Sequence, residues 1–257
     1  MSAIEVDCDH HIAQVRINRP EALNAVNSEM DRDLQAAWLR INQDQAIRVV
    51  ILSSAGDRAF CAGADVKDLD GRESQRIGFG GGLTGLGGPL TILEKPLIAA
   101  VQGLALGGGF ELALSADVIV AADSATFAMT EAKIGVISEA GVLHRLPRQL
   151  PRRIATGLLL TGRRLDAATA FHFGLVNEVV AEDELMASAE NWASEIASAS
   201  PLVVQAALAA MREGEGLPLE QAIGRRYEGI EAYQMSEDKA EAVAAFAERR
   251  RPEWLGR

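Results

Sequence analysis

The sequence contains little cysteine, few aromatic residues and no excess of positive charge. Only Cys8 and Cys61 occur among 257 residues, and without a CxxC pair neither a zinc knuckle nor a thioredoxin-like motif is present. The four histidines form no HExxH pattern, so we predict no metal site. The formal net charge of −11 argues against a general nucleic-acid binder and against attraction to an anionic membrane surface.

Long apolar segments are also missing from the chain. No run of about eighteen apolar residues is uninterrupted, so a transmembrane helix is not expected. Residues 1–7 are acidic and alternating, and they lack the basic start and apolar run of a signal peptide. We therefore predict a cytoplasmic protein with neither nucleic acid nor a membrane as a partner.

The remaining composition is that of a globular α/β protein. Hydrophobic residues make up 48% of the chain and charged residues 24%, enough to bury a sizeable core. Short β-branched runs at residues 49–54 and 118–122 predict buried strands. Ser28 is predicted to cap a helix that carries Leu34, Trp38 and Ile41 at helical spacing.

The pattern changes along the chain. Residues 71–89 are rich in glycine and predict a surface loop, and helices dominate from residue 151 onward. Strands that alternate with helices early, followed by helices, favour an α/β core with a helical extension. We place the core at residues 1–195 and the extension at residues 196–257, within one fold unit.

The first candidate for chemistry is the glycine-rich segment at residues 103–113. Gly107, Gly108 and Gly109 lie between a predicted strand and a predicted helix, where backbone N–H groups can approach a ligand. Such a helix start is suited to stabilising an oxyanion. The spacing fits neither a dinucleotide fingerprint nor a P-loop. The alternative is a tight turn that packs a helix onto a sheet.

Two glutamates follow predicted strands. Glu111 lies in an apolar run, and it is either a first-turn partner of the helix dipole or a buried functional acid. Burial would raise its pKa toward the range useful for acid–base catalysis. Glu131 is either a surface residue near Lys133 or a second catalytic carboxylate, with Thr130 as a plausible helix cap.

A second segment of small residues, at residues 60–65, follows the predicted strand at 49–54. Ligand contacts in α/β folds are often placed after strands, and an exposed N–H of Ala64 would supply a second oxyanion donor. Cys61 has no histidine placed to act as its base, so a packing role is favoured over a nucleophile.

Taken together, these segments resemble the enoyl-CoA hydratase/isomerase (crotonase) superfamily over nearly the whole chain. The resemblance depends on the order and spacing of several motifs: Arg-Pro-Glu-Ala-Leu-Asn-Ala at 19–25, Phe-Cys-Ala-Gly-Ala-Asp at 60–65, Pro-Leu-Ile-Ala-Ala-Val-Gln-Gly at 96–103, Gly-Gly-Gly-Phe-Glu-Leu-Ala at 107–113, Glu-Ala-Lys-Ile-Gly at 131–135, Phe-His-Phe-Gly-Leu-Val-Asn at 171–177 and Ala-Phe-Ala-Glu-Arg-Arg-Arg-Pro at 245–252.

This resemblance implies a spiral of ββα repeats with a C-terminal helical region, assembled as a trimer or a dimer of trimers. It implies that the N–H groups of Ala64 and Gly108 form an oxyanion hole around a thioester carbonyl, and that Glu111 and Glu131 transfer protons. Coenzyme A is then part of the substrate, and no separate cofactor is expected. The implied substrate-binding residues are Ala22, Leu23, Ala25, Ala62, Asp65, Val66, Gly107, Phe246 and Arg249.

The chain departs from typical hydratases near the second glutamate. Thr130 stands where they carry proline, and residues 138–142 read Ser-Glu-Ala-Gly-Val instead of a Pro-Gly-Ala-Gly-Gly-like run. The dienoyl-CoA isomerases and carnitinyl-CoA dehydratase resemble this chain in carrying an acidic residue at the position of Glu139. We therefore include Glu139 among the candidate catalytic residues, with a surface acid as the alternative.

Three functions remain open from the sequence. The pair of Glu111 and Glu131 favours an enoyl-CoA hydratase or dehydratase, a carbon–oxygen lyase. Glu139 favours an enoyl- or dienoyl-CoA isomerase. A non-catalytic acyl-CoA-binding homologue is the third, and the presence of both glutamates argues against it.

Overall fold

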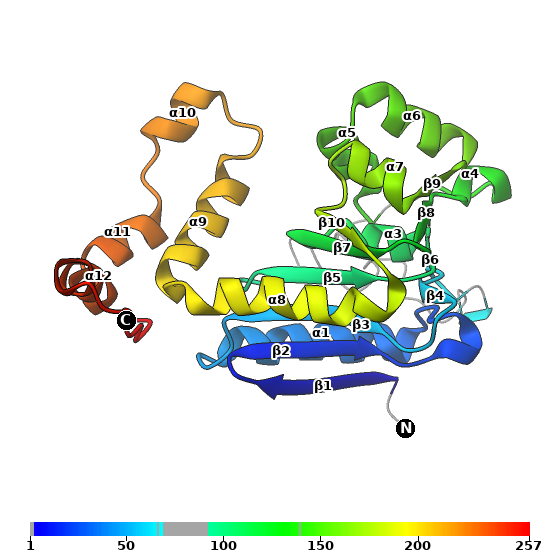
Figure 1. Ribbon diagram of the computed structural model, residues 1–257. Coiled ribbons are helices and arrows are strands. Elements are labelled where there is room, and N and C mark those ends of the chain that lie inside the picture. Colours follow the sequence, from blue (N-terminus) through cyan, green and yellow to red (C-terminus); the bar gives the residue numbers. More distant parts are fainter. Residues whose placement is uncertain (1–2, 66, 69–91, 139) are drawn as a thin grey trace.

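The computed structural model describes residues 3–65, 67–68, 92–138 and 140–257. The loop predicted at residues 71–89 lies outside the described residues, as do the candidate site residues Val66 and Glu139. Figure 1 shows the strands and helices of the core on one side and the C-terminal helices on the other.

Two sheets form the core. The larger has the order β1-β2-β3-β5-β7-β10, and the smaller has the order β4-β6-β8-β9. Their strands are β1 (Ile4–Asp9), β2 (Ile12–Ile17), β3 (Val49–Ser54), β5 (Leu97–Val101), β7 (Val118–Ala122) and β10 (Glu178–Val180), and β4 (Ala59–Cys61), β6 (Leu104–Leu106), β8 (Thr126–Ala128) and β9 (Arg164–Asp166).

Successive strand pairs build a spiral. Each of the pairs β3–β4, β5–β6 and β7–β8 gives one strand to the larger sheet and one to the smaller, in the same order in both. The helices α3 (Gly108–Ala113) and α4 (Glu131–Ile134) follow β6 and β8 directly. The predicted α/β spiral of ββα repeats is therefore confirmed, and it places the starts of α3 and α4 beside the same small sheet.

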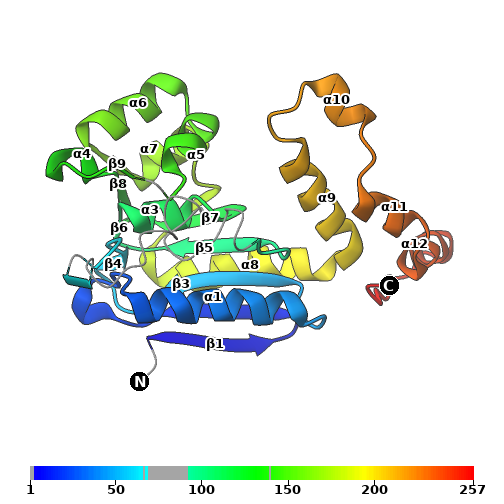
Figure 2. The ribbon, with the colours of Figure 1, turned by 180° about the vertical axis from the view of Figure 1, so that it is seen from behind.

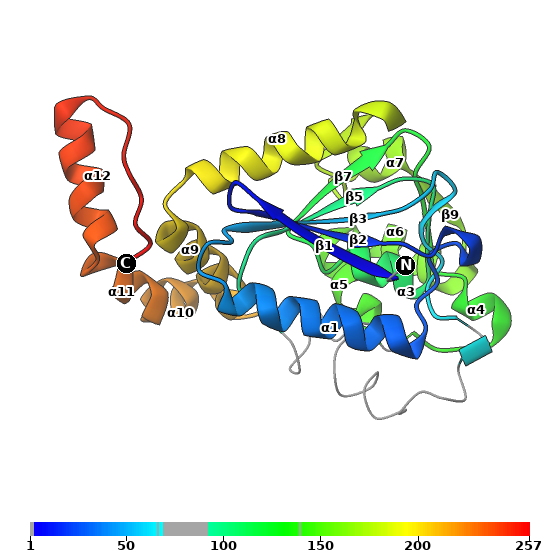
Figure 3. The same ribbon diagram turned by 90° about the horizontal axis from the view of Figure 1, so that it is seen from below.

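The larger sheet is covered on both faces, as the continuous apolar run in β3 requires. Val50 and Leu52 face one core cluster, which contains Met30, Leu34 and Trp38 of α1 (Ser28–Gln43). Figure 3 shows α1 and α8 (Leu185–Ser198) on either side of the sheet. The second cluster joins alternate strand residues to α8 through Val49, Ile51, Ile98, Ala100, Val120, Ala122, Leu185, Ala189, Ala193 and Ala197.

The start of α1 differs from the prediction by one residue. The N-cap is Asn27, whose side-chain oxygen accepts a hydrogen bond from the N–H of Met30, and Ser28 is the first helical residue. Asparagine and serine are both good caps, so residue preference alone does not choose between adjacent candidates. The apolar positions of the helix are as predicted, since Leu34, Trp38 and Ile41 are all buried.

The remaining helices of the core lie between β8 and α8. They are α5 (Val142–Gln149), α6 (Arg152–Thr161) and α7 (Ala167–His172). Short 3-10 turns lie at Pro20–Ala22, before α1, and at Glu182–Glu184, before α8. The sequence predicted α6 and α7 but not α5, which contains Pro147 near its end. Pro147 has no N–H to donate to the carbonyl four residues earlier, so this proline weakens the signal for a helix.

The C-terminal helices form an arm that extends from the core, as Figures 1 and 2 show. We use the name arm for α9 (Pro201–Gly214), α10 (Leu219–Gly224), α11 (Glu228–Gln234) and α12 (Glu237–Glu248). The domain division predicted after residue 195 falls inside α8. Among the described residues no single helix is long and apolar enough to cross a membrane, and α8 with α9 meets that test only as a pair bent by 105°.

The last residues of the chain form hydrogen bonds near the junction of the core and the arm. Asp238 is fully buried and accepts hydrogen bonds from the backbone N–H groups of Leu255 and Gly256 and from the Ser200 hydroxyl. Arg48 donates to the carbonyl oxygens of Ala197 and Trp254. A buried carboxylate needs several donors, and these contacts fix the last residues against the junction of α8 and α9.

Candidate active site

The two segments of small residues meet at the carboxyl end of the small sheet. Gly63 lies so close to the start of α3 that a Cβ built on it would be 2.8 Å from the carbonyl oxygen of Leu106 and 3.0 Å from the nitrogen of Gly108. Gly63 also has a φ of +90°, which favours glycine. The sequence predicted both segments, and the fold brings them together.

The backbone around Ala64 is held by its pairing with Val26. The N–H of Val26 donates to the carbonyl oxygen of Gly63 at 2.8 Å, and the N–H of Asp65 donates to the carbonyl oxygen of Val26 at 2.9 Å. These two hydrogen bonds form a parallel bridge between Val26 and Ala64. In such a bridge the N–H of Ala64 itself points away from Val26. The bridge therefore does not use the N–H of Ala64, and Gly108 lies on the neighbouring segment. That these two N–H groups form an oxyanion hole stays a prediction.

The predicted coenzyme A segment lies beside the same loop. The N–H of Ala62 donates to Leu23 at 3.0 Å, so Ala22, Leu23 and Ala25 are adjacent to Ala62. The segment turns at Leu23 and Asn24, which have φ values of 52° and 55°. The buried Asn24 amide holds this turn by donating to the carbonyl oxygens of Ala55 and Ala59.

An ion pair closes the segment on its other side. Arg19 donates to the carboxylate of Asp65 at 2.6 Å and to the carbonyl oxygen of Ala25 at 3.0 Å. The hydrogen bond from Arg19 lowers the pKa of Asp65. Asp65 is thus a structural partner of Arg19, and it ties the Ala25 segment to the loop that carries Ala64.

Cys61 is a packing residue, as predicted. Its side chain is fully buried, and burial raises the pKa of its thiol to about 12, so no thiolate forms near neutral pH. The backbone of Cys61 lies directly against Gly109 in α3, where any Cβ would overlap the Cys61 carbonyl oxygen. This contact fixes the distance between β4 and α3.

Glu111 is a buried acid, and its catalytic role stays a prediction. It lies in the first turn of α3, is 5% exposed, and accepts a hydrogen bond from the N–H of Val142 at 3.1 Å. Burial raises the pKa of Glu111 to about 7, and repulsion from Glu131 adds to the rise. The Val142 N–H and the positive charge of Arg145 act in the opposite direction.

Glu131 is the first residue of α4 and lies across the same backbone. Its carboxylate is in contact with Gly107, because a Cβ on Gly107 would overlap the Glu131 Oε1 atom. Burial raises the pKa of Glu131. Within the described part of the chain, its buried Oε2 atom has no hydrogen-bond partner. Thr130 occupies the N-cap position, but its side chain makes no capping hydrogen bond, so that expectation was wrong.

Both carboxylates therefore lie near the Gly107–Gly108 backbone, Glu131 against Gly107 and Glu111 in the first turn of α3. Burial raises the pKa values of both, that of Glu111 to about 7, which is a range useful for acid–base catalysis. Among the described residues, no group of three or more histidine, cysteine or acidic side chains is arranged to hold a metal ion.

Comparison with known proteins agrees with this arrangement. The family model described as enoyl-CoA hydratase/isomerase matches residues 7–257. The chain belongs to the enoyl-CoA hydratase/isomerase family. It is 41% identical to carnitinyl-CoA dehydratase from Proteus mirabilis over 251 residues, which cover 96% of this chain and 95% of that relative. The corresponding Escherichia coli K12 protein is 39% identical over 251 residues, with the same coverage.

Solved structures of enoyl-CoA hydratases show the same fold. A Novosphingobium aromaticivorans protein, whose suggested activity is that of a short chain enoyl-CoA hydratase, is 52% identical with a TM-score of 0.92. The match covers 100% of this chain and 99% of that one. An enoyl-CoA hydratase from Mycobacterium marinum is 37% identical with a TM-score of 0.92, over 99% of both chains.

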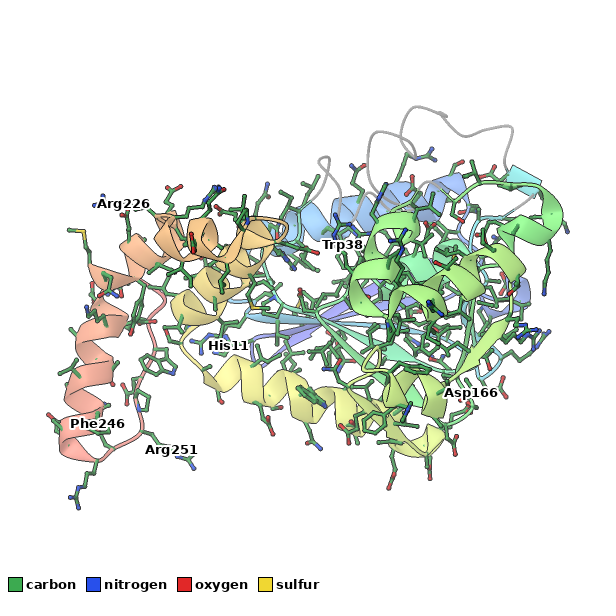
Figure 4. The ribbon with its side chains drawn as sticks, turned by 90° about the horizontal axis from the view of Figure 1, so that it is seen from above. His11, Trp38, Asp166, Arg226, Phe246 and Arg251 are labelled. Atoms are coloured by element: carbon green, nitrogen blue, oxygen red, sulfur yellow. The ribbon has the colours of Figure 1, made fainter. Side chains whose placement is uncertain are left out.

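Two predicted substrate-binding residues of this enoyl-CoA hydratase/isomerase family member lie away from the site within one chain. Phe246 and Arg249 lie at the end of α12 on the arm, and Figure 4 shows Phe246 at the opposite end of the molecule from Asp166. Phe246 is 88% exposed. The predicted contact between these residues and coenzyme A on a neighbouring subunit stays a prediction.

Sequence reasoning missed two residues that contact the Glu111 environment. Val142 and Arg145 both belong to α5, which was not predicted. The signal available was weak, because Val142 and Leu146 are the only two buried positions in this eight-residue helix. A pair at i and i+4 does not identify a helix when a proline follows at Pro147.

The raised pKa of Glu111 predicts a pH dependence of stability. Its pKa is about 7 in the folded protein against 4.5 for the ordinary side chain, so the folded state binds this proton more tightly. The stabilising contribution is present below about pH 4.5 and is lost as the pH rises to about 7. Between about pH 5 and about pH 8, we expect the free energy of unfolding to fall by roughly 2–3 kcal/mol more in the parent than in Glu111→Gln.

Urea denaturation of both proteins at the two pH values measures this difference. Glu131 is present in both proteins, so its own contribution to the pH dependence largely cancels. Equal losses of stability in the parent and in Glu111→Gln would contradict the raised pKa of Glu111.

Proposed function

We propose that this protein adds water to, or removes water from, the α,β-double bond of an acyl-CoA thioester. The observation that carries the proposal is the placement of two carboxylates with raised pKa values, Glu111 and Glu131, around the backbone donors of the Gly107–Gly108 turn. The family membership and the carnitinyl-CoA dehydratase and enoyl-CoA hydratase relatives support the same reaction.

In the proposed reaction, the thioester oxygen lies between the N–H groups of Ala64 and Gly108. These donors stabilise the negative charge of the enolate, and removal of one such donor typically costs about 3–4 kcal/mol of transition-state stabilisation. During hydration, water forms a bond to the β-carbon and gives its proton to one glutamate. The other glutamate gives a proton to the α-carbon, and dehydration follows the reverse path.

The proposed binding of coenzyme A uses the segment of Ala22, Leu23 and Ala25 with Ala62 and Asp65. The hydrogen bonds that join these two segments support one continuous backbone surface for the pantetheine part. We propose a short acyl group with a polar substituent of the carnitinyl type, because curated relatives with about 40% identity are carnitinyl-CoA dehydratases.

We also propose that the protein assembles as a trimer or a dimer of trimers in the cytoplasm. The arm carries large apolar side chains that are exposed in the single chain, including Met211, Leu219, Ile223, Met235 and Phe246. Neighbouring subunits would cover such a surface. Cys8 and Cys61 are both free thiols, which is typical of a reducing compartment.

The test compares two acyl-CoA substrates. Purified protein is mixed with crotonyl-CoA or with the dehydrated enoyl form of carnitinyl-CoA, and loss of the enoyl-thioester absorbance is followed. We expect faster loss with the decorated substrate, and a hydroxyacyl-CoA product by mass spectrometry. A product that has gained no water and has a moved double bond would replace this proposal with an isomerase, and no turnover of either substrate would contradict it.

A further inference from the structure

The side chain of Arg145 contacts the turn that precedes α5. Arg145 folds back over this turn, and its Nη1 atom donates to the carbonyl oxygen of Ala140 at 3.2 Å. The guanidinium lies against Gly141, where a Cβ would overlap Nη1. The backbone N–H groups of His144 and Arg145 both donate to the carbonyl oxygen of Gly141, at 3.0 and 2.9 Å. The side chain and the backbone of Arg145 therefore both form hydrogen bonds to the Ala140–Gly141 turn.

This turn ends at the residue that orients Glu111. Val142 is fully buried, and its N–H donates to the Glu111 carboxylate at 3.1 Å. Gly141 immediately precedes Val142 and has a φ of +111°, a conformation that needs glycine and that its neighbours must stabilise. A shift of the turn at Ala140 or Gly141 would change the direction of the Val142 N–H and release Glu111.

We propose that Arg145 is a positioning residue for Glu111: by clamping the Ala140–Gly141 turn, it aims the Val142 N–H at the carboxylate and places a positive charge beside it. The role rests on the proposed function only in that Glu111 transfers a proton. Arg145 is outside the set of residues proposed to touch the acyl-CoA.

The charges around this pair determine the sign of the expected effect. Glu111 is influenced by Glu131, which raises its pKa, and by Arg145, which lowers it. Arg145 in turn is influenced by Glu111, Glu215 and Arg212, and it remains a cation because the arginine pKa is very high. Removing the Arg145 charge leaves Glu131 as the dominant neighbouring charge and loosens the Val142 N–H. Both changes raise the pKa of Glu111.

A neighbouring arginine supplies a matched control. Arg145 and Arg148 lie on α5 and both line a cavity of about 980 Å³ between the core and the arm. Arg148 is more exposed, and it bonds to the His144 carbonyl oxygen and pairs with Glu215. Within the described part of the chain, Arg148 makes no hydrogen bond to Ala140 or Gly141. If the arginines of α5 act through the cavity or through general surface charge, replacing either one should change the pKa of Glu111. If Arg145 positions Glu111, only the replacement of Arg145 should do so.

The experiment titrates Glu111 directly in the full-length protein without substrate. Infrared spectra are recorded against pH for the parent, Arg145→Met, Arg145→Lys, Arg148→Met and Glu111→Gln. The protonated-carboxyl band that is absent in Glu111→Gln reports Glu111. We expect its midpoint near pH 7 in the parent and about one unit higher in Arg145→Met. Arg148→Met should match the parent, and Arg145→Lys should lie in between, because lysine keeps the charge without the planar fork.

Steady-state kinetics with crotonyl-CoA give a second readout. We expect Arg145→Met to lower kcat at least tenfold while KM changes less than threefold. The midpoint of the pH profile of kcat should move by the same amount as the infrared midpoint. An unchanged midpoint in Arg145→Met, or an equal shift in Arg148→Met, would overturn the proposal. If Arg145→Met does not fold, an Arg145→Lys midpoint equal to that of the parent, with a lowered kcat, also overturns it.

The two readouts separate this inference from the proposed function. If no acyl-CoA is turned over but the infrared midpoint moves as expected, the positioning role holds and the proposed reaction fails. If turnover is found but the midpoint does not move, the reaction stands and Arg145 has no positioning role.

Discussion

Replacing Glu131 with glutamine is expected to lower kcat by on the order of 10²–10⁴-fold, the usual range for a lost acid–base group. The Glu131 carboxylate lies against Gly107, and its buried Oε2 atom has no hydrogen-bond partner in the described part of the chain. Glutamine keeps the shape but cannot exchange a proton. The fold loses no hydrogen bond of Oε2, so the thermal transition should be no lower than that of the parent.

A second glutamate serves as the control for this substitution. Glu184 is exposed near the start of α8, and Glu184→Gln should leave kcat unchanged. Initial rates with the better acyl-CoA substrate, measured at several pH values, give the comparison. If Glu131→Gln keeps kcat within threefold of the parent at every pH, Glu131 transfers no proton in the reaction and the two-carboxylate mechanism is wrong.

Replacing Gly109 with alanine is the second substitution with a large expected effect. A Cβ on Gly109 would overlap the carbonyl oxygen of Cys61 and approach its carbonyl carbon to 2.7 Å. Both are backbone atoms of a buried strand and cannot move aside as a flexible side chain would. The helix α3 must shift away from β4, which separates Gly108 from Ala64. We expect both a lowered free energy of unfolding and the loss of nearly all turnover.

The matched control for this change is Gly157→Ala in α6. A Cβ on Gly157 would meet no atom within 4 Å, and alanine is favoured over glycine in a helix by roughly 0.5–1 kcal/mol. We expect unchanged turnover and equal or higher stability for Gly157→Ala. Urea denaturation and initial rates of both variants test the pair. Parent-like stability and turnover in Gly109→Ala would show that the spacing between β4 and α3 does not matter.

Much of the fold could be predicted because its signals are local. The apolar run of β3 and the helical spacing of Leu34, Trp38 and Ile41 each lie within a few turns of chain. Burial on both faces of the sheet follows from the continuous apolar run at residues 49–52 of β3. The cap at Asn27 and the helix α5 were missed, since a one-residue choice of cap and a short helix with a proline carry little local signal.

The sequence by itself determined which chemical groups are available. It supplied Glu111 and Glu131, the glycines at 107–109 and the loop that ends at Ala64, and their order indicated the family. The type of each group and its spacing along the chain are properties of the sequence itself. The pKa values of the two glutamates could not be determined from the sequence, because they depend on burial.

Only the tertiary structure decided how these groups act on one another. Gly63 meets Gly108, Glu131 meets Gly107, and the Val142 N–H reaches Glu111, although each of these pairs lies far apart in the chain. The raised pKa of Glu111 comes mainly from its burial, and repulsion from Glu131 adds to it. Desolvation and close contact are properties of the packed molecule, and no local pattern of residues encodes them.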